Sequence, residues 1–286
     1  MRRPERLRAR CDDPRPRAGV GVINLTSLIR AGEQTEHISL DLIAAQPGEA
    51  VELGPGNEQL AVILSGRAAV ALDGRDVGVV GGRSDVFEGA GDAVYLPPES
   101  SAVLLPAGDG DSTEFTMAVV SAPAGSLPAG PARLIRGATQ REVVVGRDSW
   151  GRTVRTILGP DDPASRLIVG ETVHAGTGTW SSFPPHRHDR KSAEEARLEE
   201  VYYYRVHPAN GFAVQVRYDT DGGQENLRMV RDGAAAAITS GFHPLVAAPG
   251  HGLYYLWILA GEERAMRVFI DPRYRWVMEQ AAAERR

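Results

Sequence analysis

The sequence predicts an all-β protein built from two similar units. Short, valine-rich apolar runs recur along its 286 residues, and turn-forming Gly, Pro and Asp separate them. This spacing is typical of antiparallel β-sandwiches and barrels. The second half also repeats the first, with an apolar run, a glycine-centred turn and a returning run. We therefore expect two β-sandwich domains in tandem.

The apolar runs define the expected strands in order. Those of the first half and the junction lie at 61–74, 92–98, 114–123 and 141–146. Those of the second half lie at 165–173, 199–208, 212–218, 253–261 and 266–271. Helical patterning is scarce: 192–200 can open with a helical turn, and 276–286 is expected to form a terminal helix.

A stretch rich in Pro, Ala and Gly at 121–137 is the best linker candidate. We place the boundary near residue 135, which gives one domain at 19–135 and another at 136–286. The basic start MRRPERLRAR lacks the apolar segment of a secretory signal, so residues 1–18 are expected to be disordered.

Composition excludes several classes of protein. The net charge is -5, and no basic excess points to nucleic acid. No apolar run approaches the roughly 20 residues of a membrane span, so a cytoplasmic location is the default. Cys11 is the only cysteine, which rules out an intrachain disulfide. A metal site must therefore use His and carboxylates. A few local arginines can still bind an acidic substrate.

Three histidines and a carboxylate pair indicate a metal site. His186 and His188 stand two apart in PPHRHD, so on a strand both imidazoles face the same side. Glu199 and Glu200 open a strong strand, and His243 lies in GFHP. Such a mixed set of nitrogen and oxygen donors suits Zn, Mn, Fe or Ni. The plain alternative is an isolated H-x-H pair with His243 on a surface turn.

Strand alternation sends Glu199 and Glu200 to opposite faces. Glu199 shares its face with Val201 and Tyr203, whereas Glu200 shares its face with Tyr202. Periodicity alone does not choose the ligand.

Several segments together resemble the 5-deoxy-glucuronate isomerases, a family of two-domain cupins in myo-inositol catabolism. They are GGRSDVFEG at 81–89, AVYLPP at 93–98, WSSFPPHRHD at 180–189, LEEVYYYRV at 198–206, GFAVQVRY at 211–218, GFHPLVAAPG at 241–250 and LYYLWILAG at 253–261. The resemblance covers most of the chain and implies two tandem cupin (jelly-roll) domains, with metal in the second only.

The resemblance also implies a metal set. In the related uronate isomerases of pectin breakdown the metal glutamate directly precedes a Val-Tyr strand, which selects Glu200. The implied ligands are His186, His188, Glu200 and His243, around one divalent ion, zinc first and Mn or Fe next. The chain departs from the family pattern at Thr239, Phe242, His251 and Gly252, all near the expected pocket.

The implied activity is an aldose–ketose isomerisation of 5-deoxy-glucuronate to 5-dehydro-2-deoxy-gluconate through a metal-stabilised enediolate. Glu199, if its strand is bulged, and Tyr255 are the candidate catalytic groups. Gln215 and Arg217, which share a face, and Arg264 are candidates for the substrate carboxylate.

The implied partner is a small acidic sugar, with no nucleic acid or membrane, and a homo-oligomer is expected. Alternatives are an isomerase of a related keto-uronate, an iron dioxygenase, and a non-enzymatic sugar-binding cupin. The ligand set alone does not separate them.

Overall fold

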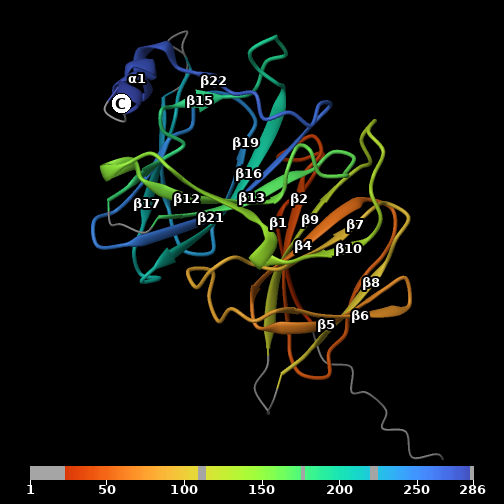
Figure 1. The fold of residues 1–286 in the computed structure, drawn as a ribbon. Helices are drawn as coiled ribbons and strands as arrows, with labels where there is room; N and C mark the ends of the chain where they lie inside the picture. Colours follow the sequence, from red (N-terminus) through yellow and green to blue (C-terminus); the bar gives the residue numbers. More distant parts are fainter. Residues whose placement is uncertain (1–22, 109–113, 175–177, 220–224, 284–286) are drawn as a thin grey trace, which may run out of the picture.

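The computed structural model describes residues 23–108, 114–174, 178–219 and 225–283, so the predicted disordered start at 1–18 lies outside the described residues. Figure 1 shows two groups of strands, one coloured red to yellow and the other green to blue. Nearly all of the regular structure is antiparallel strand, and the predicted all-β class is confirmed.

The first group contains a six-stranded and a four-stranded sheet. The larger has the order β1-β2-β9-β4-β7-β10 and the smaller β3-β8-β5-β6. Their bounds are β1 Asn24–Ile29, β2 Ser39–Ala45, β3 Val51–Leu53, β4 Glu58–Ser65, β5 Arg67–Leu72, β6 Arg75–Gly81, β7 Ala93–Leu96, β8 Ala102–Pro106, β9 Phe115–Ala122 and β10 Arg133–Ile135.

The second group repeats this plan. Its larger sheet has the order β11-β12-β13-β21-β16-β19, its smaller sheet β14-β20-β17-β18, and β15 pairs with β22. The bounds are β11 Arg141–Val145, β12 Arg152–Leu158, β13 Ile168–His174, β14 Trp180–Ser181, β15 His186–Arg187, β16 Leu198–His207, β17 Ala213–Arg217, β18 Asn226–Val230, β19 Ala235–Ile238, β20 Leu245–Ala247, β21 Gly252–Gly261 and β22 Phe269–Ile270. These are the sheets of two cupin units.

Strand order reveals the internal repeat. In each group a four-stranded run of the larger sheet, β2-β9-β4-β7 and β13-β21-β16-β19, follows the same path. Within the described residues, all pairings between named strands stay inside one group. The domain boundary near residue 135 stays a prediction, and β10, which ends at Ile135, is the last strand of the first group.

Three apolar clusters explain how the units pack. One fills the first sandwich and includes Ile63 and Phe115, and a second fills the other sandwich and includes Tyr204 and Trp257. The third joins the outer faces of the two large sheets, with Leu60 of β4 among its residues. Because both faces of these sheets are covered, β21 is apolar and β16 is buried along most of its length, rather than alternating between buried and exposed residues.

Local sequence signals were mostly reliable. The run predicted at 61–74 is split at Gly66, whose φ is +80° and where a Cβ would lie 2.4 Å from the carbonyl oxygen of Glu114. The terminal helix α1 spans Arg275–Ala283, after short 3₁₀ turns at Gly137–Thr139, Asp148–Trp150 and Pro272–Tyr274. No helix in the described part of the chain is long and apolar enough to cross a membrane.

The helical turn predicted at 192–200 is wrong. The described backbone there is bent and leads directly into β16. Side chains replace the helical hydrogen bonds: Ser192 Oγ accepts the backbone N–H groups of Glu194 and Glu195, and the Glu195 carboxylate accepts those of Asp189 and Arg190.

Candidate metal centre

His188, Glu200 and His243 meet inside the second sandwich and form a group that can hold a metal ion. His188 directly follows β15, Glu200 lies in β16, and His243 lies between β19 and β20. The Nε2 atoms of both histidines lie 3.1 Å from Oε2 of Glu200. All three side chains are buried. The ligand atoms thus converge although their residues are up to 55 positions apart.

The outer nitrogen of each ring is held by the backbone. Nδ1 of His188 lies 3.0 Å from the carbonyl of Leu198, and Nδ1 of His243 lies 2.9 Å from that of Gly241. A carbonyl only accepts, so each Nδ1 carries the proton and donates it. Nε2 is thus the nitrogen available to a metal ion, and a ring whose other nitrogen donates to a carbonyl is typical of metal-binding histidines. The donor set therefore fits a divalent ion.

His186 lies beside this group without joining it. Its ring centroid is 5.0 Å from that of His243 and 6.3 Å from that of His188. Its Nδ1 also faces a backbone carbonyl, that of Pro184 at 3.3 Å, so its Nε2 has the same ligand role available. Its assignment as a fourth ligand stays a proposal.

Electrostatics make Glu200 the anionic centre of the group. Burial by itself raises the pKa of Glu200, but the contacts with His188 and His243 outweigh it and lower that pKa to about 2. Burial lowers the pKa of His188, yet the Glu200 carboxylate outweighs it and raises that pKa. Burial, with the positive potential of His243 and His188, lowers the pKa of His186 to about 3. Without an ion, the contact between Nε2 of His188 and Glu200 favours a proton on that nitrogen, and a bound divalent cation would take the place of this proton.

Gln215, predicted to bind substrate, contacts the backbone of His243 in the metal group. It is buried, accepts a hydrogen bond from the hydroxyl of Tyr204, and donates to the carbonyl oxygen of His243 at 3.1 Å. Its amide is thus occupied in holding the His243 loop.

The two arginines predicted to bind substrate have structural partners. Arg217 donates to the carbonyls of Ala237 and Ser240, each at 3.1 Å. Arg264 donates to carbonyls between Gly159 and Leu167, in the connection from β12 to β13. Its guanidinium holds this loop, and its predicted role in binding the substrate carboxylate stays a prediction.

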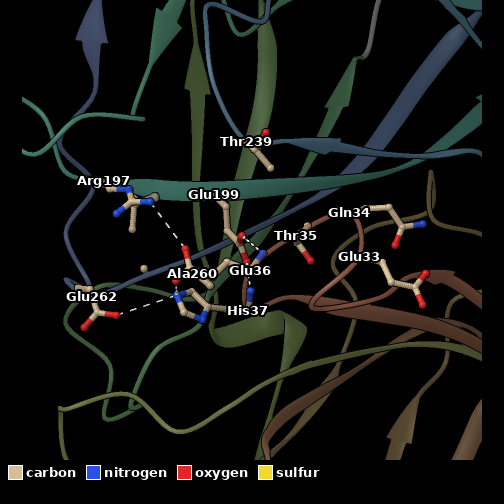
Figure 2. A pocket seen from close by; sticks show the side chains of 12 residues that line it. Glu33, Gln34, Thr35, Glu36, His37, Arg197, Glu199, Thr239, Ala260 and Glu262 are labelled. Carbon is tan, nitrogen blue, oxygen red and sulfur yellow. Dashed lines mark hydrogen bonds and ion pairs between the residues drawn. The ribbon is translucent and has the colours of Figure 1, made fainter.

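Glu199 does not agree with its predicted role as a catalytic base. Its carboxylate accepts the backbone N–H groups of Glu36, His37 and Ile38, at 2.6, 2.7 and 2.8 Å. Figure 2 shows it pointing into a surface pocket between the two units, with His37 and Thr35 nearby. The strand is not bulged at this point, so alternation sends Glu199 away from Glu200.

Tyr255, the second predicted catalytic group, does lie inside the metal-containing sandwich. Its hydroxyl shares a hydrogen bond of 2.5 Å with Oγ of Ser181. Its ring centroid is 4.7 Å from that of Tyr202, which in turn is 6.2 Å from that of His243. Tyr202 therefore separates Tyr255 from the metal group, and a catalytic role for Tyr255 stays a proposal.

Two buried residues of the second sandwich were not predicted to lie in its interior. Arg152 opens β12, a strand that the apolar runs did not indicate, and His174 ends β13. Their side chains are 9% and 2% exposed. An alternating reading of 152–158, in which Arg152 and Val154 share a face, was the available signal.

Comparisons with known proteins agree on one family. A family model described as the KduI/IolB family matches residues 18–277. The 5-deoxy-glucuronate isomerase of Geobacillus kaustophilus (strain HTA426) is 33% identical over 254 residues, which are 87% of this chain and 88% of that protein. That of Geobacillus thermodenitrificans (strain NG80-2) is also 33% identical over 254 residues, or 87% and 89%.

Solved structures extend the comparison to the fold. The crystal structure of an IolB-like protein from Salmonella typhimurium LT2 has a TM-score of 0.82 and 28% identity, over 88% of this chain and 94% of that chain. A mutant oxalate decarboxylase of Bacillus subtilis, 13% identical, has a TM-score of 0.62 over 94% of this chain and 81% of that one, a likeness of fold alone.

Proposed function

The chain belongs to the KduI/IolB family, and from that premise we propose that it isomerises 5-deoxy-glucuronate to 5-dehydro-2-deoxy-gluconate. The observation that carries the proposal is the similarity, over 87% of the chain, to relatives named 5-deoxy-glucuronate isomerase. The buried His188, Glu200 and His243 group supports it, because the reaction needs a place to stabilise negative oxygen.

The chemical problem is a weak carbon acid. An aldehyde becomes a ketone when one proton moves between two adjacent carbons, and negative charge develops on the oxygens meanwhile. When bound, a divalent ion supplies Lewis-acid stabilisation of that charge. The chain's own part is to hold and orient. Buried imidazoles with fixed Nδ1 protons keep the ligand geometry, and the buried Tyr202 and Tyr255 rings pack beside them.

We propose zinc as the ion and His186 as its fourth ligand. Three imidazoles and one carboxylate suit zinc, and manganese and iron accept the same donors. The Nδ1 contact of His186 with Pro184 supports this, because it repeats the arrangement at His188 and His243. A role in myo-inositol catabolism, a cytoplasmic location and a homo-oligomeric state accompany the proposal.

The test is turnover followed by proton NMR. Purified protein, analysed for metal, is given 5-deoxy-glucuronate without nicotinamide, flavin or oxygen. We expect the 2-deoxy-5-keto product, and in heavy water some deuterium in it, because the moving proton exchanges with a base. A chelator should stop turnover, and Zn²⁺, Mn²⁺ or Fe²⁺ should restore it.

Three outcomes count against the proposal. Turnover of a related uronate alone would keep the isomerisation and change the substrate. Oxygen consumption with Fe²⁺ would indicate a dioxygenase. Tight calorimetric binding of the sugar acid to metal-loaded protein without any product would indicate a non-enzymatic binding protein.

A further inference from the structure

Arg152 is a buried cation. Its side chain shares the inner face of β12 with Val154, which packs on the apolar cluster of the second sandwich. Its guanidinium donates to the carbonyl of Trp150 at 3.1 Å, and the nearby Tyr255 hydroxyl favours its charged form. Among the described residues no carboxylate forms an ion pair with it. Burying a guanidinium in this way is costly unless an anion joins it.

Other buried arginines show how unusual this is. Arg83 pairs with Glu171 at 3.0 Å, and Arg187 pairs with Glu195 at 3.3 Å. Arg264 has the same exposed fraction as Arg152, 9%, and also lacks a carboxylate partner within the described chain. However, all of its charged nitrogens donate to backbone carbonyls. Arg152 therefore has N–H groups left to donate to a ligand, whereas those of Arg264 already donate to backbone carbonyls.

His174 adds a second unused polar group next to it. Nδ1 donates to the carbonyl of Thr179 at 3.1 Å, and the buried Nε2 has no hydrogen-bond partner within the described residues. Burial, together with the nearby positive charge of Arg152, lowers the pKa of His174 to about 4, so the ring is neutral at neutral pH. Nε2 then carries a lone pair that can accept a hydrogen bond from a hydroxyl group.

These groups belong to the same interior as the metal ligands. The ring of His174 lies edge-on to that of Tyr255 at 6.1 Å, and Tyr255 contacts Tyr202, which faces His243. Ring contacts thus connect His243 of the metal group, through Tyr202 and Tyr255, to His174, and Arg152 lies beside Tyr255 as well. An open-chain sugar acid carries a carbonyl at one end, hydroxyls between, and a carboxylate at the other end, so it needs both kinds of group in one interior.

We infer that Arg152 binds the substrate carboxylate and that His174 accepts a hydrogen bond from a substrate hydroxyl, in an anion subsite completed by Tyr255 and Ser181. This rests on the proposed function, whose metal group takes the carbonyl end. The planar guanidinium fork matches two carboxylate oxygens, whereas a neutral sugar leaves the buried charge unpaired. The subsite therefore selects acids over neutral aldoses.

The experiment compares 5-deoxy-glucuronate with its neutral C6 amide on metal-loaded protein. We expect the wild type to prefer the acid by about 100-fold or more in kcat/KM, because a site built for a charged group rejects an analogue lacking it. Arg152→Gln should lose about 100-fold on the acid, mainly through KM, with full metal content and little change on the amide. Arg152→Lys should fall between them.

Arg264→Gln is the matched control, since it removes an arginine of equal burial whose contacts are structural. It should lose stability but keep the acid-to-amide ratio. Equal rates on acid and amide in the wild type would overturn the inference even if Arg152→Gln does not fold. So would a folded, metal-loaded Arg152→Gln that keeps the acid preference.

The outcomes also separate this inference from the proposed function. If the wild type isomerises neither compound, the isomerase proposal fails, and calorimetry with 5-deoxy-glucuronate then decides the subsite. Binding of the acid that is weakened about 100-fold in Arg152→Gln and unchanged in Arg264→Gln would sustain it. Binding unaffected by Arg152→Gln would end it.

Discussion

Glu199 and Glu200 are sequence neighbours whose carboxylates lie on opposite faces of β16. Oε2 of Glu200 lies 3.1 Å from the imidazoles of His188 and His243 inside the second sandwich. Oε1 of Glu199 lies 2.7 Å from the backbone nitrogen of His37, in a turn of the first unit. One residue is placed to bind metal, and the other anchors the metal-bearing strand to its neighbour.

This relationship predicts opposite results from the same substitution. Glu200→Gln should lose bound metal and activity, because the anionic oxygen is removed. Glu199→Gln should keep the metal while the free energy of unfolding falls by about 1–3 kcal/mol, since an amide cannot accept all three N–H groups. Metal analysis and urea unfolding measure the two effects, and metal loss in Glu199→Gln alone would reverse the assignment.

The histidines should not contribute equally. His188→Ala and His243→Ala should remove the ion, because both nitrogens lie within the buried group. His186→Ala should weaken metal affinity by about 10–100-fold, because it removes the proposed fourth ligand and leaves the other three in place. Competition with a chromogenic chelator measures the affinity. Full affinity in His186→Ala would mean that three residues hold the ion.

The buried ion cluster between the units should be important for stability. Glu171 is buried, pairs with Arg83 at 3.0 Å and Arg155 at 3.2 Å, and accepts a hydrogen bond from Tyr254. Arg83→Met should cost about 3 kcal/mol of unfolding free energy, because it leaves part of a buried charge unpaired.

Arg30→Met is the control for that measurement. Arg30 pairs with Glu33 at 3.9 Å, and both side chains are more than 60% exposed. A loss of at most about 0.5 kcal/mol is expected from such a pair. Similar losses for both variants in urea unfolding would contradict the importance of the buried cluster.

His174 should make stability depend on pH. Its pKa falls from 6.5 to about 4 on folding, chiefly through burial, so the unfolded chain binds the proton more readily. Its stabilising contribution is therefore complete above pH 6.5 and is lost as the pH falls toward 4. The shift corresponds to about 3 kcal/mol. His174→Gln should flatten this part of the stability–pH curve, and an unchanged slope would show that the ring is not neutral and buried as described.

Much of the fold could be read from residue pattern. The runs at 92–98, 114–123, 199–208 and 253–261 became strands with nearly the predicted bounds, because valine-rich segments between turn residues have few other stable states. The histidines of PPHRHD and GFHP were also visible, since H-x-H spacing and a Gly-Pro turn stand out in a chain with seven histidines.

The roles of the individual charged residues depended on how the strands pack together in the tertiary structure. Strand alternation predicts that Glu199 and Glu200 point to opposite faces of their strand. Only the packing of the sheets shows which of these faces lies inside the second sandwich with His188 and His243. Arg217 and Arg264 looked like carboxylate binders, yet nearby backbone carbonyls occupy their guanidinium groups. Arg152 looked ordinary. Its burial, with no carboxylate partner among the described residues, follows from the neighbouring of β12, β13 and β21, and sequence periodicity carries no information about which strands become neighbours.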